Sequence, residues 1–267
     1  MLRRAHLSVQ QLESRDIPAQ FGIPWDNGTA ITVSFAPDGT SVDRSASNLH
    51  ELMAQSGLAP AVWQNEILRA FQAWASQADL NIGVVRDSGA SLGTAGKPQA
   101  DPRFGDIRIF AAPLARSVLA ITIPPGDLSG TRTGDIILNS NYNFGAGSGR
   151  DLYTVFLQEA GHSLGIGNSG ELSSAMYEFY QGTRSGLSSA DVAQVRSLYG
   201  ARPANTWEPD GGNNTAATAT NLLGNGTLVT YGDTAIRRTP ATPTDTYSLL
   251  LRVEPRPSHC EPTARAC

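Results

Sequence analysis

A predicted helix over residues 151–165 constrains the fold of this chain more than any other segment, because it joins a buried stripe to a polar face. Its apolar residues recur at helical spacing, at Leu152, Val155, Phe156 and Ala160. Such a stripe indicates a helix packed against a core. Gln158 and His162 are four residues apart and therefore lie on the same side of the helix. The segment predicts a helix that packs its apolar stripe on a core and carries Gln158 and His162 together on one side.

The remaining pattern predicts a sheet combined with two further helices. Five segments have strand character and are separated by Gly, Pro or Ser; they cover residues 30–36, 80–87, 105–112, 118–124 and 134–140. Helices are predicted over 60–77 and 188–199, the latter with Ser188 as its N-cap and Gly200 at its end. Residues 41–57 are polar and irregular, and no regular element is predicted there.

Composition excludes several classes of function. The net charge is −4 and the pI is near 5.6, whereas nucleic-acid binding favours a basic patch or stripe. No stretch of about 18 apolar residues is present, so no transmembrane helix is expected. Cys260 and Cys267 both fall in the last eight residues and define no disulfide framework for the main body. A monomer is expected.

The two ends of the chain differ in character from the middle. Residues 1–24 contain two arginines near the start but no apolar core of a signal peptide. Leu12 to Arg15 resembles a short segment that opens many exported surface proteins of bacteria, and a disordered N-terminus is the alternative. That resemblance implies an extracellular or cell-surface location. Residues 203–267 begin as a linker rich in Asn, Thr and Gly.

The segment from Gln158 to Ser169 resembles the metzincin signature H-E-x-x-H-x-x-G-x-x-H. In that signature histidines four residues apart share a zinc ion, the glutamate acts as general base, and the glycine turns the chain toward a third histidine. Glu159, His162 and Gly165 match the pattern. Gln158 and Asn168 stand at the first and third histidine positions instead.

Further matches extend the resemblance to matrixin-type metzincins over about residues 25–202. Met176 falls at the Met-turn, and Tyr180 follows four residues later in the specificity wall, where Glu178 replaces a usual proline. The resemblance implies an α+β fold, with a mixed, twisted five-stranded sheet and three helices. It also implies an edge strand, near residues 118–123, that pairs with a peptide or protein substrate.

The substitutions make the zinc chemistry of this chain the central question. A catalytic zinc takes three protein ligands and a water, and an amide oxygen is a weak substitute for imidazole. We therefore expect weak or absent zinc binding at Gln158, His162 and Asn168, and impaired or lost hydrolysis of peptide bonds. The alternatives are a weakly active zinc metalloendopeptidase, in which Glu171 is a candidate recruited ligand, and a non-enzymatic surface module that binds peptides or matrix. Without zinc, Glu159 is a helix carboxylate that could pair with His162. The resemblance also allows calcium between residues 113 and 150.

The C-terminal region resembles the start of a bacterial pre-peptidase C-terminal domain. The matching pieces are residues 208–210, 214–220 and 245–247. About 60 polar residues bury too little surface for independent stability. Residues 203–267 are therefore predicted to form a linker and a partial β-rich or disordered appendage.

Overall fold

The structure is a computed structural model, and it describes residues 21–126 and 129–203. The predictions for the export-type segment up to residue 20 lie outside these residues. So do those for the C-terminal appendage from residue 204 onward, including both cysteines. Within the described part of the chain, no helix is long and apolar enough to cross a membrane.

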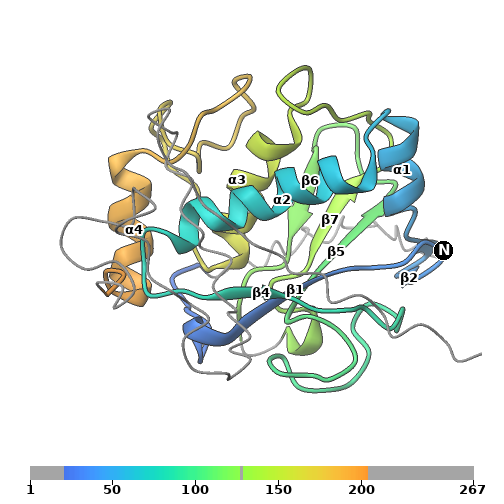
Figure 1. The fold of residues 1–267 in the computed structure, drawn as a ribbon, viewed down its shortest axis with the longest axis horizontal. Coiled ribbons are helices and arrows are strands. Elements are labelled where there is room, and N and C mark those ends of the chain that lie inside the picture. Colours follow the sequence, from blue (N-terminus) through green and yellow to red (C-terminus); the bar gives the residue numbers. More distant parts are fainter. Residues whose placement is uncertain (1–20, 127–128, 204–267) are drawn as a thin grey trace, which may run out of the picture. The chain divides into compact units, whose positions relative to one another are not determined.

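The core of the domain is the five-stranded mixed sheet that the sequence predicts (Figure 1). Its strands, in spatial order, are β4 (Ile82–Val84), β1 (Ile31–Phe35), β5 (Ile107–Ala112), β7 (Ile136–Asn139) and β6 (Ala120–Thr122). The first four run parallel, and β6 pairs antiparallel to β7 at the edge. β5 and β7 are buried along their whole length, and their sequences are apolar apart from Arg108 and Asn139.

The three predicted helices are present, as α2 (Pro60–Ala75), α3 (Leu152–Ser163) and α4 (Ser189–Tyr199). α2 lies across the sheet and packs against α3 (Figure 1). The apolar face of α2 is buried, and the indole nitrogen of Trp74 donates to the carbonyl of Leu157 in α3 at 2.8 Å. This bond fixes α3 within the core, so the polar residues on its other side point outward from a rigid support. The domain also contains two short 3-10 helices, η1 (Gly28–Ala30) and η2 (Gly130–Arg132).

The prediction that residues 41–57 lack regular structure is wrong. They contain a small hairpin of β2 (Ser41–Val42) and β3 (Ser45–Ala46), followed by a fourth α-helix, α1 (Leu49–Gln55). α1 is too short for a clear periodic pattern. Its N-terminus is stabilised by Asp38, whose carboxylate accepts from two backbone N–H groups of the first turn at 2.8 and 2.9 Å. Asp38 lies ten residues before the N-cap residue Asn48, whereas capping rules consider the side chain of the N-cap residue itself.

Candidate functional site

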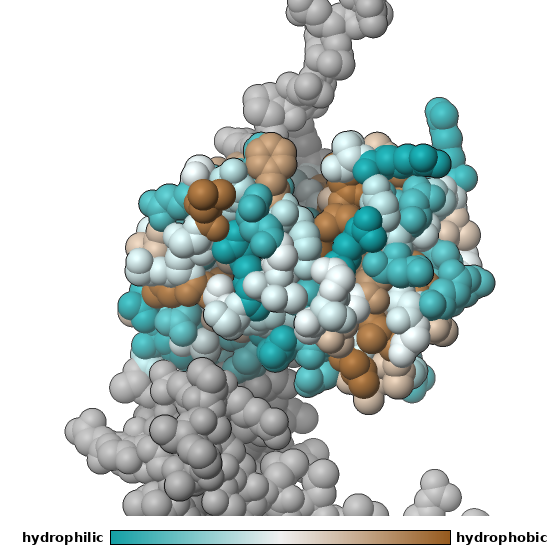
Figure 2. Space-filling model, turned by 90° about the horizontal axis from the view of Figure 1, so that it is seen from above, coloured by the Kyte–Doolittle hydropathy of each residue, from teal (hydrophilic) through white to brown (hydrophobic). Residues whose placement is uncertain are grey.

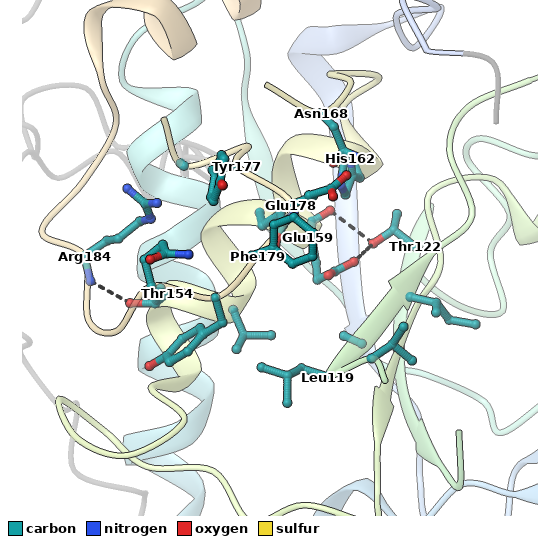
Figure 3. A pocket seen from close by; sticks show the side chains of 18 of the residues that line it. Leu119, Thr122, Thr154, Glu159, His162, Asn168, Tyr177, Glu178, Phe179 and Arg184 are labelled. Carbon is teal, nitrogen blue, oxygen red and sulfur yellow. Dashed lines mark hydrogen bonds between the residues drawn. The ribbon is translucent and has the colours of Figure 1, made fainter. Parts of the chain in front are cut away.

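A cleft with a volume of about 370 Å³ lies between the edge strand β6 and helix α3 (Figure 3). Its walls come from residues 117–122, from α3, and from the segments around residues 168 and 175–184. The face seen in Figure 2 is mainly polar, with its apolar side chains in small separate groups. Among the exposed large apolar residues, Ile121 and Phe179 line the cleft.

Glu159 lies at the base of the cleft and is almost entirely buried. Its carboxyl oxygen Oε2 accepts a hydrogen bond of 2.5 Å from the hydroxyl of Thr122 in β6. Burial raises the pKa of Glu159, while the neighbouring His162 and the bond from Thr122 oppose that rise. Sequence reasoning missed Thr122, because its contact with Glu159 spans 37 residues of chain and no local pattern reports it.

His162 lies one helical turn beyond Gln158, and both side chains line the cleft. Its Nδ1 lies 2.8 Å from the carbonyl oxygen of Ile166. Since a carbonyl only accepts hydrogen bonds, Nδ1 carries a proton, and this leaves Nε2 as the nitrogen whose lone pair can bind a metal. The ring of Phe21 also packs on the imidazole, with centroids 5.0 Å apart. These two contacts hold the imidazole in one orientation, as hydrogen bonds from neighbouring groups orient the histidines that bind metals.

The other groups at this site do not complete a set of zinc ligands. Gln158 is half-buried and Asn168 is exposed, and both line the cleft. Glu171 is exposed and does not line it. No three His, Cys, Asp or Glu side chains of residues 21–126 and 129–203 are grouped so that they could hold a metal ion. One imidazole and two amides do not fit the donor set of a catalytic zinc, and no acidic cluster in the same residues supports the calcium that the resemblance allows.

Gly165 ends α3 in a conformation that other residues rarely adopt. Its φ is +88°, and a Cβ atom there would lie 2.3 Å from the backbone oxygen of Ile23. The Gly165 carbonyl also accepts from the backbone N–H of Gly22 at 2.7 Å. The turn that leads from His162 toward Asn168 therefore depends on glycine for both its φ angle and its close packing.

We expect Gly165→Ala to lower the free energy of unfolding by about 2–4 kcal/mol, because the left-handed conformation and the backbone clash add together. Chemical denaturation followed by circular dichroism measures this change. Gly170→Ala is the matched control, since a Cβ atom there meets nothing within 4 Å. It should change stability by less than about 0.5 kcal/mol. Equal stability of the two variants would contradict the tight turn at Gly165.

Met176 lies fully buried beneath α3, at the position predicted for the Met-turn. A Cβ atom on Gly161 would lie 2.3 Å from its sulfur, so helix and turn are in direct contact. Asp191 in α4 anchors this turn: one carboxylate oxygen accepts from the backbone N–H of Ala175 at 2.8 Å, and the other accepts from the hydroxyl of Ser174. Asp191 also completes the capping box with Ser188 at the N-terminus of α4.

The residues assigned to the specificity wall both line the cleft. Glu178 is exposed at its rim, whereas Tyr180 is half-buried. The Tyr180 hydroxyl accepts from the backbone N–H of Asp151 at 2.9 Å and donates to the carbonyl of Gly149 at 2.8 Å. Tyr180 therefore secures the N-terminus of α3 in addition to lining the cleft.

Comparison with known proteins finds matrixins, the family whose fold the sequence analysis expects. The family model for matrixin matches residues 50–200. A probable matrix metalloproteinase 095L of Invertebrate iridescent virus 3 is 32% identical over 155 residues, which are 55% of this chain and 38% of the relative. Karilysin of Tannerella forsythia is 27% identical over 66% of this chain and 37% of its own length. Matrilysin of Rattus norvegicus is 34% identical over 51% of this chain and 50% of its own length.

The chain spans half or less of the length of these relatives. Residues 50–200, which the matrixin model matches, include β4, β5, β6 and β7, the helix that carries Glu159 and His162, and Met176. The chain belongs to the matrixin family of metzincin metallopeptidases.

Proposed function

We propose that this domain binds extended peptide segments in its cleft and that zinc-dependent hydrolysis of the peptide bond is impaired or lost. The single observation that carries the proposal is the donor set of the cleft. One oriented imidazole stands beside two amides, in a cleft bounded by β6, α3 and residues 175–184.

Peptide binding is supported by the position of β6. Among the described strands, β6 is an edge strand of the sheet, paired only with β7, and forms one wall of the cleft. Alternate backbone groups of an edge strand point away from the sheet and can pair with an added strand. The apolar side chains of Ile121 and Phe179 at the rim give an extended peptide additional surface to cover.

Loss of hydrolysis is supported by the state of the two groups that remain. His162 supplies one basic nitrogen, whereas a catalytic zinc takes three protein ligands. Glu159 is buried and hydrogen-bonded to Thr122. Without a metal to lower the pKa of a bound water, Glu159 has no activated water from which to accept a proton.

A weakly active zinc endopeptidase is the second candidate, and the geometry of His162 favours it. The bond from Nδ1 to Ile166 leaves Nε2 ready to bind a metal, and Glu159 is retained one residue after the first ligand position. A non-enzymatic module that binds peptides or matrix at the cell surface is the third. For each of these, the family membership supports a protein or peptide partner and an extracellular setting.

Binding and cleavage of the same peptides separate these candidates. In NMR spectra of the labelled domain, addition of extended peptides should shift the backbone amide resonances of β6 and α3. After long incubation of the same peptides with the domain, mass spectrometry should detect no cleaved product. Cleavage that a chelator inhibits and that Glu159→Gln abolishes would establish the weak endopeptidase instead. Absence of any shift at β6 would overturn peptide binding.

A further inference from the structure

We propose that the end of the cleft formed by Arg184, Thr154 and Tyr177 is a subsite for an acidic side chain of the bound peptide. The inference rests on the proposed peptide binding and names the class of peptide that the cleft prefers. Figure 3 shows these three residues on the side of the cleft away from Thr122 and Glu159.

Arg184 is held in place by bonds at both of its ends. Its backbone N–H donates to the hydroxyl of Thr154 at 2.8 Å. Its guanidinium donates to the carbonyl oxygens of Ser173 and Leu172, at 3.1 and 2.9 Å. A guanidinium has five N–H donors, and these two bonds use only two of them. The unused N–H groups can still donate to the two oxygens of a carboxylate. Because the side chain is already ordered, binding a ligand costs little further entropy.

The charge of Arg184 has no carboxylate partner within residues 21–126 and 129–203. The ion pairs of this region involve Arg69, Arg103, Arg108 and Arg132. Asp151 is linked to Arg184 through Thr154, but its carboxylate accepts from the backbone N–H groups of Gly147 and Thr154 and from the Thr154 hydroxyl. Backbone carbonyls order the Arg184 guanidinium without neutralising it.

The location of Arg184 strengthens its effect on a ligand. The residue is half-buried and lines the cleft, so its field is screened less than that of a fully exposed cation. The acidic groups of the cleft, Glu159 and Glu178, are labelled apart from it in Figure 3, toward Thr122 and the rim. Arg184 lies across the cleft from Thr122 in β6 (Figure 3), so a side chain of a peptide paired with β6 would reach across the cleft to meet this positive group.

The test uses the unchanged full chain and labelled peptides of about eight residues, a length suited to strand addition. One scanned position carries Glu, Gln, Leu or Lys, and the flanking positions are mixtures. Fluorescence anisotropy measures each affinity. At the preferred position we expect Glu to bind about tenfold more tightly than Gln or Leu, with Lys weakest, since a charge-assisted bidentate contact is lost in the others.

Matched variants assign the preference to Arg184. Arg184→Met should remove the advantage of Glu over Leu, and Arg184→Glu should reverse the order so that Lys peptides bind best. Arg116→Met is the control, because Arg116 is exposed and lies outside the cleft, and it removes the same charge. It should leave the order unchanged.

Each result decides between the two proposals. A peptide affinity that does not depend on the scanned residue, or a preference for Leu that survives Arg184→Met, would overturn the acidic subsite while leaving peptide binding intact. Failure of every peptide to bind the unchanged chain would overturn both. Reversal in Arg184→Glu, with Arg116→Met unaffected, would establish the subsite even if overall affinity falls.

Discussion

Replacing Gln158 and Asn168 together by histidine is expected to raise the zinc affinity of the domain by at least about a thousandfold, because two nitrogens that bind zinc directly are gained. The variant should carry one zinc ion per chain. Gln158 precedes His162 by one helical turn, and Asn168 lines the same cleft beyond the turn at Gly165. Both positions are therefore placed to contribute a nitrogen beside Nε2 of His162.

Each single replacement should give an intermediate affinity, since a site with two histidines still lacks one ligand. Competition with a chromophoric chelator measures zinc affinity in the four related chains. A double variant that binds no more zinc than the unchanged chain would show that α3 and the following turn do not bring these positions together. A gain that survives His162→Ala would show that the zinc lies elsewhere.

The double variant is also expected to hydrolyse peptides, and adding Glu159→Gln should reduce that activity by about 100- to 10,000-fold, the range of a general base. Glutamine keeps an oxygen that can accept the hydrogen bond from Thr122, so the cleft should retain its shape. It cannot accept a proton from water. Zinc content should remain at one equivalent in this triple variant.

Peptide cleavage and zinc content, measured on the same preparations, separate loss of the base from loss of the metal. Activity that persists in the triple variant would mean that Glu159 is not the base. A double variant that binds zinc tightly yet cleaves nothing would place the defect in the cleft walls. Thr122, which binds the Glu159 carboxyl, and Glu178 at the rim would then be the first positions to change.

The sequence predicts the fold well where the pattern is periodic and local. The apolar stripe of α2 and the five strand segments depend on spacing alone, and all are present. α1 was missed because its cap comes from Asp38 rather than from its own N-cap residue. The burial of Arg108 in β5 was equally hidden, since it requires Asp87, 21 residues away, to form an ion pair of 2.8 Å.

The candidate site divides in the same way. Spacing placed Gln158 and His162 on one side of a helix, and both line the cleft. Thr122, Asp191 and Arg184 act through partners 37, 16 and 30 residues away in the chain, and only the packed fold reveals them. Residues that act through local geometry were identifiable from the sequence, whereas those that connect separate elements were not.

A zinc titration of the unchanged chain tests the central claim most directly. At micromolar free zinc and neutral pH, elemental analysis after equilibrium dialysis should find well under one equivalent per chain, beside one equivalent in the double variant. The shortage of nitrogen ligands is the reason. One full equivalent in the unchanged chain, lost on His162→Ala, would show that Gln158 and Asn168 support a working zinc site and would contradict the account.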